Sequence, residues 1–202
     1  MTATAGGEDG PPDQELVQRF KAGREDAFVA LMARHERRVY NLAYRMLGAA
    51  EDARDATQDA FLSCYRHLAG FRGDAAFSTW LHRIAVNACY DLLRKRPPTA
   101  SSLDDRPEAA GGSIDPAEQA AAAADVQRAL LLVPPEFRAV LIMHEIQDLS
   151  VEDVAAALEI PVGTVKSRLH RGRISLGRAL AGEPGLAAEP RPAPLPSKPS
   201  SQ

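Results

Sequence analysis

The stretch from Ser150 to Leu180 reads SVEDVAAALEIPVGTVKSRLHRGRISLGRAL, and it decides the fold expected for this part of the chain. Its first four residues form a capping box, which predicts a short helix ending near Leu158. After a tight turn at 159–161, a second helical period runs to about Leu180. That second helix carries five Lys or Arg residues and no acidic residue. Two short helices in this order, the second one basic, are typical of a helix-turn-helix.

The basic helix has two unlike faces when its residues are placed 100° apart. Val165, Leu169 and Leu176 recur at spacings of four and seven, which predicts that they face the core. The opposite side carries Thr164, Ser167, His170 and Arg171. Lys166, Arg168 and Arg173 flank the apolar stripe. Short polar groups and forked Arg donors can meet base edges in a major groove, and flanking cations suit phosphates. A basic helix that is merely solvated is the alternative interpretation.

The remainder of the chain shows helical periods and no confident strand, so the sequence predicts an all-α fold. Helices are expected from Asp13 as N-cap to near Gly23, over an amphipathic run ending at Gly48, over 50–68, from Ser78 as N-cap to about Arg96, over 115–133, and through Phe137 to His144.

Two small helical domains are expected within this all-α fold. Pro97-Pro98 stops the fourth helix, and the residues that follow are rich in Pro, Ser, Asp and Gly. We therefore expect helical domains at 13–97 and 115–182, joined by a flexible linker at 98–114. Residues 1–12 and the Pro-rich tail at 183–202 are expected to be disordered.

The net charge of −3 conceals a segregated distribution of charge. Residues 51–59 carry four acidic side chains against one basic one, whereas 161–180 are purely basic. This segregation suggests separate surfaces for separate partners. No apolar run approaches the roughly 18 residues that cross a bilayer, and the first twelve residues lack the layout of a secretory signal. We therefore expect a cytoplasmic protein.

The sequence offers little material for catalysis or metal binding. Cys64 and Cys89 each fall within an apolar helical stripe, so they are interpreted as reduced core thiols. A disulfide or a metal pair is the alternative, but no Cys/His cluster at ligand spacing supports it. The chain has no G-x-S-x-G, H-E-x-x-H or Gly-rich phosphate loop. We expect no enzyme activity, no cofactor, no bound metal and no small-molecule substrate.

The fourth expected helix places a tryptophan on its polar side. Leu81, Ala85, Ala88 and Leu92 form the apolar stripe of this helix. The other side carries Trp80, Arg83, Asn87, Asp91 and Arg94, with Lys95 close by. An aromatic platform beside cations can hold unpaired bases, at about 1–3 kcal/mol for each stacked base. Packing of Trp80 against the preceding loop or a neighbouring helix is an equally open interpretation.

Three segments resemble motifs of one known family. DATQDAFL at Asp55–Leu62 resembles the core-polymerase-binding motif of sigma-70-type factors. FRGDAAFSTWLHRIAVN at Phe71–Asn87 resembles the promoter-melting segment of the extracytoplasmic-function (ECF) group of these factors. IPVGTVKSRL at Ile160–Leu169 resembles that group's recognition helix. The segments occur in the family's order, and the resemblance covers about residues 13–181.

The resemblance implies roles for individual residues. It implies a region 2-like domain that binds core RNA polymerase and captures the minus-10 element, followed by a region 4-like domain that reads the minus-35 element. Core polymerase would contact Asp55, Gln58, Asp59, Phe61 and Leu62. Trp80, Arg83 and Asn87 would serve promoter melting, with Arg94 and Lys95 as nearby cations. Lys166, Ser167, His170 and Arg171 would read bases. One departure is Glu159, which stands in the turn where a glycine would be expected.

The resemblance also implies partners and leaves one alternative open. The partners would be core RNA polymerase, promoter DNA of stress-responsive genes and an anti-sigma factor, the last anchored in the membrane. The alternative function is a stand-alone helix-turn-helix regulator whose N-terminal half senses a signal. Such a regulator would need a pocket or phosphoacceptor site, and the sequence shows no strand-based receiver pattern.

Overall fold

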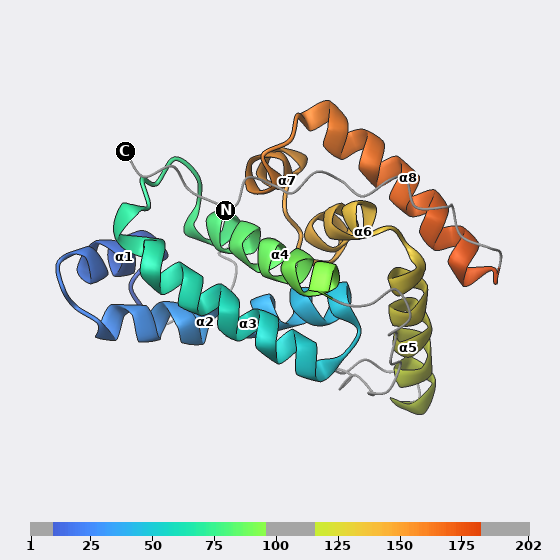
Figure 1. Ribbon diagram of the computed structural model, residues 1–202, viewed down its shortest axis with the longest axis horizontal. Helices are drawn as coiled ribbons and strands as arrows, with labels where there is room; N and C mark the ends of the chain where they lie inside the picture. The colour runs from blue at the N-terminus through green and yellow to red at the C-terminus, as the bar shows by residue number, and fades with distance from the viewer. Residues whose placement is uncertain (1–9, 96–115, 183–202) are drawn as a thin grey trace, which may run out of the picture.

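Every regular element is helical in the part of the chain that the computed structural model describes, residues 10–95 and 116–182 (Figure 1). The helices are α1 (Asp13–Lys21), α2 (Asp26–Leu47), α3 (Ala50–His67), α4 (Phe77–Lys95), α5 (Pro116–Leu132), α6 (Pro135–Leu141), α7 (Val151–Leu158) and α8 (Val162–Leu180). A 3-10 turn, Leu68–Gly70, follows α3, and a π-helical turn, Ile142–Ile146, follows α6. The predicted all-α fold is confirmed. The expected linker and both expected disordered ends lie wholly or mostly outside the described residues.

Helices α2, α3 and α4 form the core of the N-terminal half. Each packs against the other two, and α1 lies against α2. Leu31, Leu42, Met46 and Leu81 are fully buried between them. The small residues of α3, including Ala53 and Ala60, are also buried and allow its backbone to approach its neighbours closely. Leu81 lies in the apolar stripe predicted for α4, because apolar residues at spacings of three and four share one side of a helix.

Two helix starts differ from those expected. Asp13 does not cap α1 but lies in its first turn, and its carboxylate accepts hydrogen bonds from Arg34 Nη1 (2.6 Å) and His35 Nε2 (2.7 Å). Burial alone would raise the pKa of Asp13, but these bonds outweigh it and lower the pKa below its usual value. Ser78 is likewise inside α4, which begins one residue earlier. At Asp13 the bonds to α2, which a local capping rule cannot detect, take the carboxylate away from the helix end.

Helices α5 to α8 form the C-terminal half, in which α6 and α5 both pack against α8. The predicted capping box of α7 is confirmed, because Ser150 Oγ accepts a hydrogen bond from the Asp153 amide at 3.0 Å. At Gly172 of α8, an added Cβ would lie 2.9 Å from Leu141 Cγ, so only glycine permits this approach of α8 to α6. The helix-turn-helix predicted from 150–180 is therefore present and tightly packed.

Both cysteines are buried free thiols, Cys64 in α3 and Cys89 in α4. Burial raises the pKa of each to about 12, which keeps the thiols protonated and weakly reactive. This agrees with the interpretation of both residues as core thiols.

The two halves also contact each other, which the sequence did not predict. Helix α7 packs against α4, and α5 packs against α2 (Figure 1). The hydrophobic core runs from one half into the other without interruption. The two helical domains therefore pack against each other in this state.

Candidate functional site

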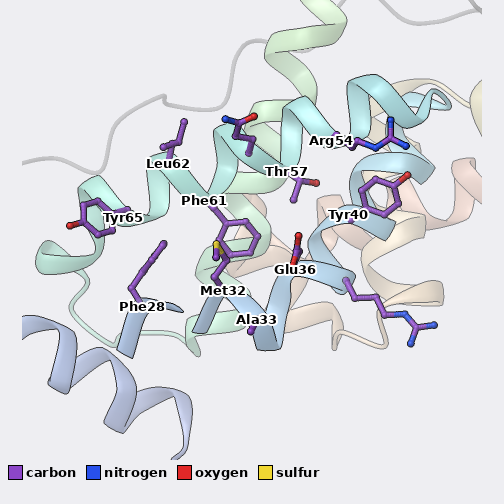
Figure 2. A pocket seen from close by; sticks show the side chains of 12 residues that line it. Phe28, Met32, Ala33, Glu36, Tyr40, Arg54, Thr57, Phe61, Leu62 and Tyr65 are labelled. Carbon is purple, nitrogen blue, oxygen red and sulfur yellow. The ribbon is translucent and has the colours of Figure 1, made fainter. Parts of the chain in front are cut away.

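A groove of about 670 Å³ lies between α2 and α3 on the N-terminal half (Figure 2). Phe28, Met32 and Tyr40 line it from α2. Phe61, Leu62 and Tyr65 line it from α3. Leu62 and Tyr65 are more than two-fifths exposed, which is unusual for large apolar side chains so close together. An exposed apolar surface of this kind marks a site where another molecule can bind.

Of the residues expected to bind core polymerase, some line the groove and others lie outside it. Gln58, Phe61 and Leu62 line the groove. Phe61 is nearly buried and lies beside Met32 between the two helices (Figure 2). Asp55 and Asp59 are exposed on the same helix but do not line the groove. The structure therefore offers an apolar groove on a helix that also displays acidic side chains.

Three groove residues escaped the sequence analysis as functional candidates. Phe28 and Met32 belong to the amphipathic run that ends at Gly48, yet both are only half-buried and open into the groove. Tyr65 follows Phe61 by four residues, and this second apolar row on α3 was the signal that could have revealed it. The Tyr65 hydroxyl donates to Glu25 Oε1 at 3.0 Å, and this bond raises the tyrosine pKa. The ring packs edge-on against Phe28, so the tyrosine is held in place at the rim.

The melting segment places Trp80 against aromatic neighbours. The Trp80 ring centroid lies 5.0 Å from that of Phe71 in the preceding loop and 6.0 Å from that of Phe77. The interpretation that Trp80 packs against the preceding loop therefore describes this state. The residue as a whole stays half-buried and is not fully enclosed.

The other candidate residues on α4 differ in their exposure and in their ion pairs. Arg83 pairs with Glu159 of the helix-turn-helix at 2.5 Å, and its side chain is only 19% exposed. Asn87 is half-buried, whereas Arg94, which pairs with Asp91, and Lys95 are exposed. A cavity of about 460 Å³ lies beside Trp80 and Arg83, with Ala156, Ala157 and Glu159 on its far wall. Helix α7 and the turn after it therefore stand over this part of α4.

The basic helix α8 displays most of its predicted face. Lys166, Ser167, His170 and Arg171 are exposed, and Thr164 and Arg168 are half-buried. Val165 and Leu169 are buried as predicted, whereas Leu176 is only half-buried. Arg173 is exposed but pairs with Glu145 at 2.6 Å, which ties α8 to the turn after α6. The candidate base-reading face is therefore available to a partner in this state.

Neither a metal cluster nor a membrane span is found in the described part of the chain. No group of three or more His, Cys, Asp or Glu residues there could hold a metal ion. None of the helices at 13–95 and 116–180 is long and apolar enough to cross a bilayer.

Comparison with known proteins identifies the family. The chain is 45% identical over 177 residues to "ECF RNA polymerase sigma factor SigM" of Mycobacterium tuberculosis, covering 87% of this chain and 88% of that relative. The family models "Sigma-70 region 2" and "Sigma-70, region 4" match residues 31–97 and 123–176. The chain belongs to the sigma-70 family, in its ECF group.

Other relatives of this sigma factor extend the likeness to further organisms and to solved structures. It is 33% identical over 180 residues to "ECF RNA polymerase sigma factor SigW" of Bacillus subtilis, covering 83% of this chain and 96% of that one. The solved structure of CnrH in complex with the cytosolic domain of CnrY matches with a TM-score of 0.64 at 26% identity, over 84% of this chain and 97% of CnrH.

The sigma factor directs RNA polymerase to promoters, as its family does. A stand-alone helix-turn-helix regulator is not favoured, because the N-terminal half matches region 2 of sigma-70 factors.

Proposed function

We propose that this sigma factor uses three separate surfaces, one for core RNA polymerase and one for each of the two promoter elements. The groove between α2 and α3, with the acidic side chains beside it, binds core RNA polymerase. The face of α4 around Trp80 and Asn87 holds unpaired bases of the minus-10 element. The exposed face of α8 reads the minus-35 element as duplex. Residues 13–97 and 115–182 then act as the two functional domains.

The observation that carries this proposal is the exposed polar face of α8 on an otherwise packed C-terminal half. Lys166, Ser167, His170 and Arg171 are exposed together on this helix, opposite buried Val165 and Leu169. A helix with this arrangement can enter a major groove with donors toward base edges. The −3 net charge of the chain does not oppose this role, because α8 itself carries five basic residues and no acidic one.

The groove supports the assignment of the core-polymerase surface. It combines exposed apolar groups, Leu62 and Tyr65, with the exposed carboxylates of Asp55 and Asp59 on one helix. Apolar contact supplies affinity, and charge complementarity steers association and fixes the register. A basic partner helix with an apolar stripe has the chemistry that fits this surface.

Two further expectations belong to the same proposal. The CnrH structure holds a bound cytosolic domain of a second protein, CnrY, which supports an anti-sigma factor as a partner of this chain, one anchored in the membrane. The protein works in the cytoplasm at stress-responsive promoters and carries no enzyme activity of its own.

Capture of core polymerase by charge-reversed variants tests the proposal. Asp55→Lys and Asp59→Lys should weaken capture of the full chain by core polymerase at least tenfold when combined, while helicity stays normal. Glu152→Lys, at an exposed acidic residue on α7 in the other half, is the matched control and should bind as wild type does. Unchanged capture by the double variant would refute the assignment of this surface.

A further inference from the structure

The C-terminal end of α1 supports one rim of the groove between α2 and α3. The Phe20 ring centroid lies 5.8 Å from that of Phe28 and 5.4 Å from that of Tyr65. Phe28 and Tyr65 line the groove, and their own centroids are 5.1 Å apart. Tilted and edge-on ring pairs are attractive beyond the area that they bury. Phe20 therefore helps to hold two residues of the surface proposed to bind core polymerase.

A second aromatic cluster lies around Trp80. The Phe71 and Phe77 ring centroids lie 5.0 and 6.0 Å from that of Trp80, and 6.1 Å from each other. Phe71 belongs to the loop at residues 71–76, between the 3-10 turn and α4. A loop has no helical ladder of hydrogen bonds to fix it, so its position depends on individual contacts. The contact that Trp80 makes with Phe71 therefore depends on what holds this loop.

Lys21 connects the two clusters. It follows Phe20 in α1, and its Nζ donates a hydrogen bond of 2.5 Å to the carbonyl oxygen of Phe71, 50 positions later in the chain. Helix α1 also packs against the 3-10 turn that precedes Phe71. Two neighbouring residues of one helix thus contact the rim of the groove and the loop beside Trp80.

A lysine at this place also has a simpler role, because a cation in the last turn of a helix stabilises the helix dipole. Arg19 stands in the same turn and pairs with Glu15 within α1 itself. Lys21 instead bonds to the backbone of a different segment. Its contact therefore does more than support its own helix.

Helix α1 is fixed at its other end as well. The Asp13 carboxylate accepts hydrogen bonds from Arg34 Nη1 at 2.6 Å and His35 Nε2 at 2.7 Å, both on α2. Leu16 and Val17 are buried in the middle of the helix. These contacts tie α1 to α2 along most of its length, so the helix is a firm support for its last residue.

We propose that Lys21 is a positioning residue for promoter opening. Its ammonium group holds the Phe71 carbonyl, which keeps the Phe71 ring beside Trp80 on the face of α4 that receives unpaired bases. Because Phe20 supports the rim of the groove, the loop is also held at a fixed place relative to bound core polymerase. The inference rests on the proposed role of α4 in base binding, and it adds a residue that itself touches no base.

The test variant is Lys21→Met, which keeps the length of the side chain and removes the donor. The probe is a fluorescent single-stranded minus-10 oligonucleotide, selected from a random pool by wild-type holoenzyme. One hydrogen bond changes an equilibrium by about two- to tenfold, so Lys21→Met holoenzyme should bind the probe more weakly by that factor. Lys21→Arg keeps a cationic donor and should restore binding. Loss in both variants would overturn the inference.

The matched control is Arg19→Met, which removes an exposed cation from the same turn of α1. It should bind the probe as wild type does, and an equal loss would show a general effect of charge and overturn the inference. Salt dependence provides a second control. A direct contact between Lys21 and a phosphate would make the salt slope of Lys21→Met lower by about one unit, whereas a positioning residue leaves the slope unchanged. A lower slope would therefore also overturn the inference.

Trp80→Ala distinguishes failure of this inference from failure of the proposed function. If Trp80→Ala weakens binding of the probe and Lys21→Met does not, Lys21 does not position the loop, and the proposed role of α4 stands. If neither variant weakens binding, the proposed role of α4 fails.

The fluorescence of Trp80 then tests Lys21 without nucleic acid, because Trp80 is the only tryptophan in the chain. Acrylamide should quench it more strongly in Lys21→Met than in wild type or Arg19→Met, since the Phe71 ring is no longer held beside it. Equal quenching in these three chains would overturn the inference.

Discussion

Helices α4 and α8 carry the two sets of residues proposed to contact DNA. The two sets differ in how far the rest of the molecule covers them. The α8 face is open, with Ser167 and Arg171 exposed. The α4 face is partly covered, with Arg83 paired to Glu159 and Trp80 packed against Phe71. A duplex can dock on a face that is already exposed, whereas unpaired bases become available only after polymerase has bound. The difference suggests that the two elements of a promoter are read in sequence.

Removing Arg138, whose guanidinium joins the two halves, should have the largest effect. Arg138→Ala leaves the carbonyls of Met46, Leu131 and Val133 without their charged donor. We expect a loss of about 3 kcal/mol in the free energy of unfolding, because a hydrogen bond from a charged group contributes roughly 1.5–3 kcal/mol. Urea denaturation followed by circular dichroism measures it.

The number of steps in the unfolding of Arg138→Ala is a second measurement. Wild type should unfold in one cooperative step, and the variant should show two steps, since the halves are no longer coupled. Arg128→Ala, which removes an exposed arginine of α5, serves as the control. A single transition with unchanged midpoint in Arg138→Ala would contradict the coupling.

Trp80→Ala tests the covered face. Loss of one stacking platform should raise the free-energy barrier to initiation at duplex promoters by about 1–3 kcal/mol, which lowers transcription roughly fivefold to 150-fold. A template opened in advance at minus 10 should recover part of this loss, because melting is no longer needed. Run-off transcription with purified holoenzyme measures both. Equal losses on the two templates would show that Trp80 acts in packing and not in opening.

The open face is tested by comparing two arginines of α8. Arg171 lies among the exposed candidates for base contact, so Arg171→Ala should cost about 1–3 kcal/mol and relax preference at one or two minus-35 positions. Arg173→Ala should weaken binding to all sequences alike and lower the salt slope by about one unit. Holoenzyme binding to minus-35 variants at several salt concentrations separates them.

The structure adds a control for that comparison. Arg173 pairs with Glu145, so Glu145→Gln should free its guanidinium for a phosphate and strengthen binding slightly at every sequence. Identical profiles for Arg171→Ala and Arg173→Ala would mean that the helix faces DNA differently from the arrangement proposed.

The smallest expected effect concerns His82, on the buried side of α4. Burial lowers its pKa, and the bond between its Nδ1 and the Ser78 carbonyl only partly opposes this. The unfolded chain therefore binds a proton more readily, so this contribution to stability is present above about pH 6.5 and is lost as the pH falls below it. His82→Gln should flatten the dependence of the melting temperature on pH between 7.5 and 5.5. An unchanged slope would contradict the assignment.

Local sequence rules predicted much of the C-terminal half, which carries the exposed face of α8. The Ser150 capping box, the turn before Pro161 and the stripe through Val165 and Leu169 depend on residues close in sequence, and all appear in the structure. Residues three and four apart must share a side of a helix, so the exposed face of α8 followed without tertiary information. The same rules failed at Asp13, whose carboxylate bonds to Arg34 and His35 of α2 instead of capping α1, and at Ser78, which lies inside α4.

By itself, then, the sequence determined the all-α class, most helix boundaries, the basic face of α8 and the family, because each depends on short-range spacing. Only the tertiary structure showed the groove between α2 and α3, since its walls, Phe28 and Tyr65, are 37 positions apart in the chain. Only the tertiary structure paired Glu159 with Arg83 and brought Arg138 to the end of α2. Such contacts join residues tens of positions apart, and no helical period can encode them.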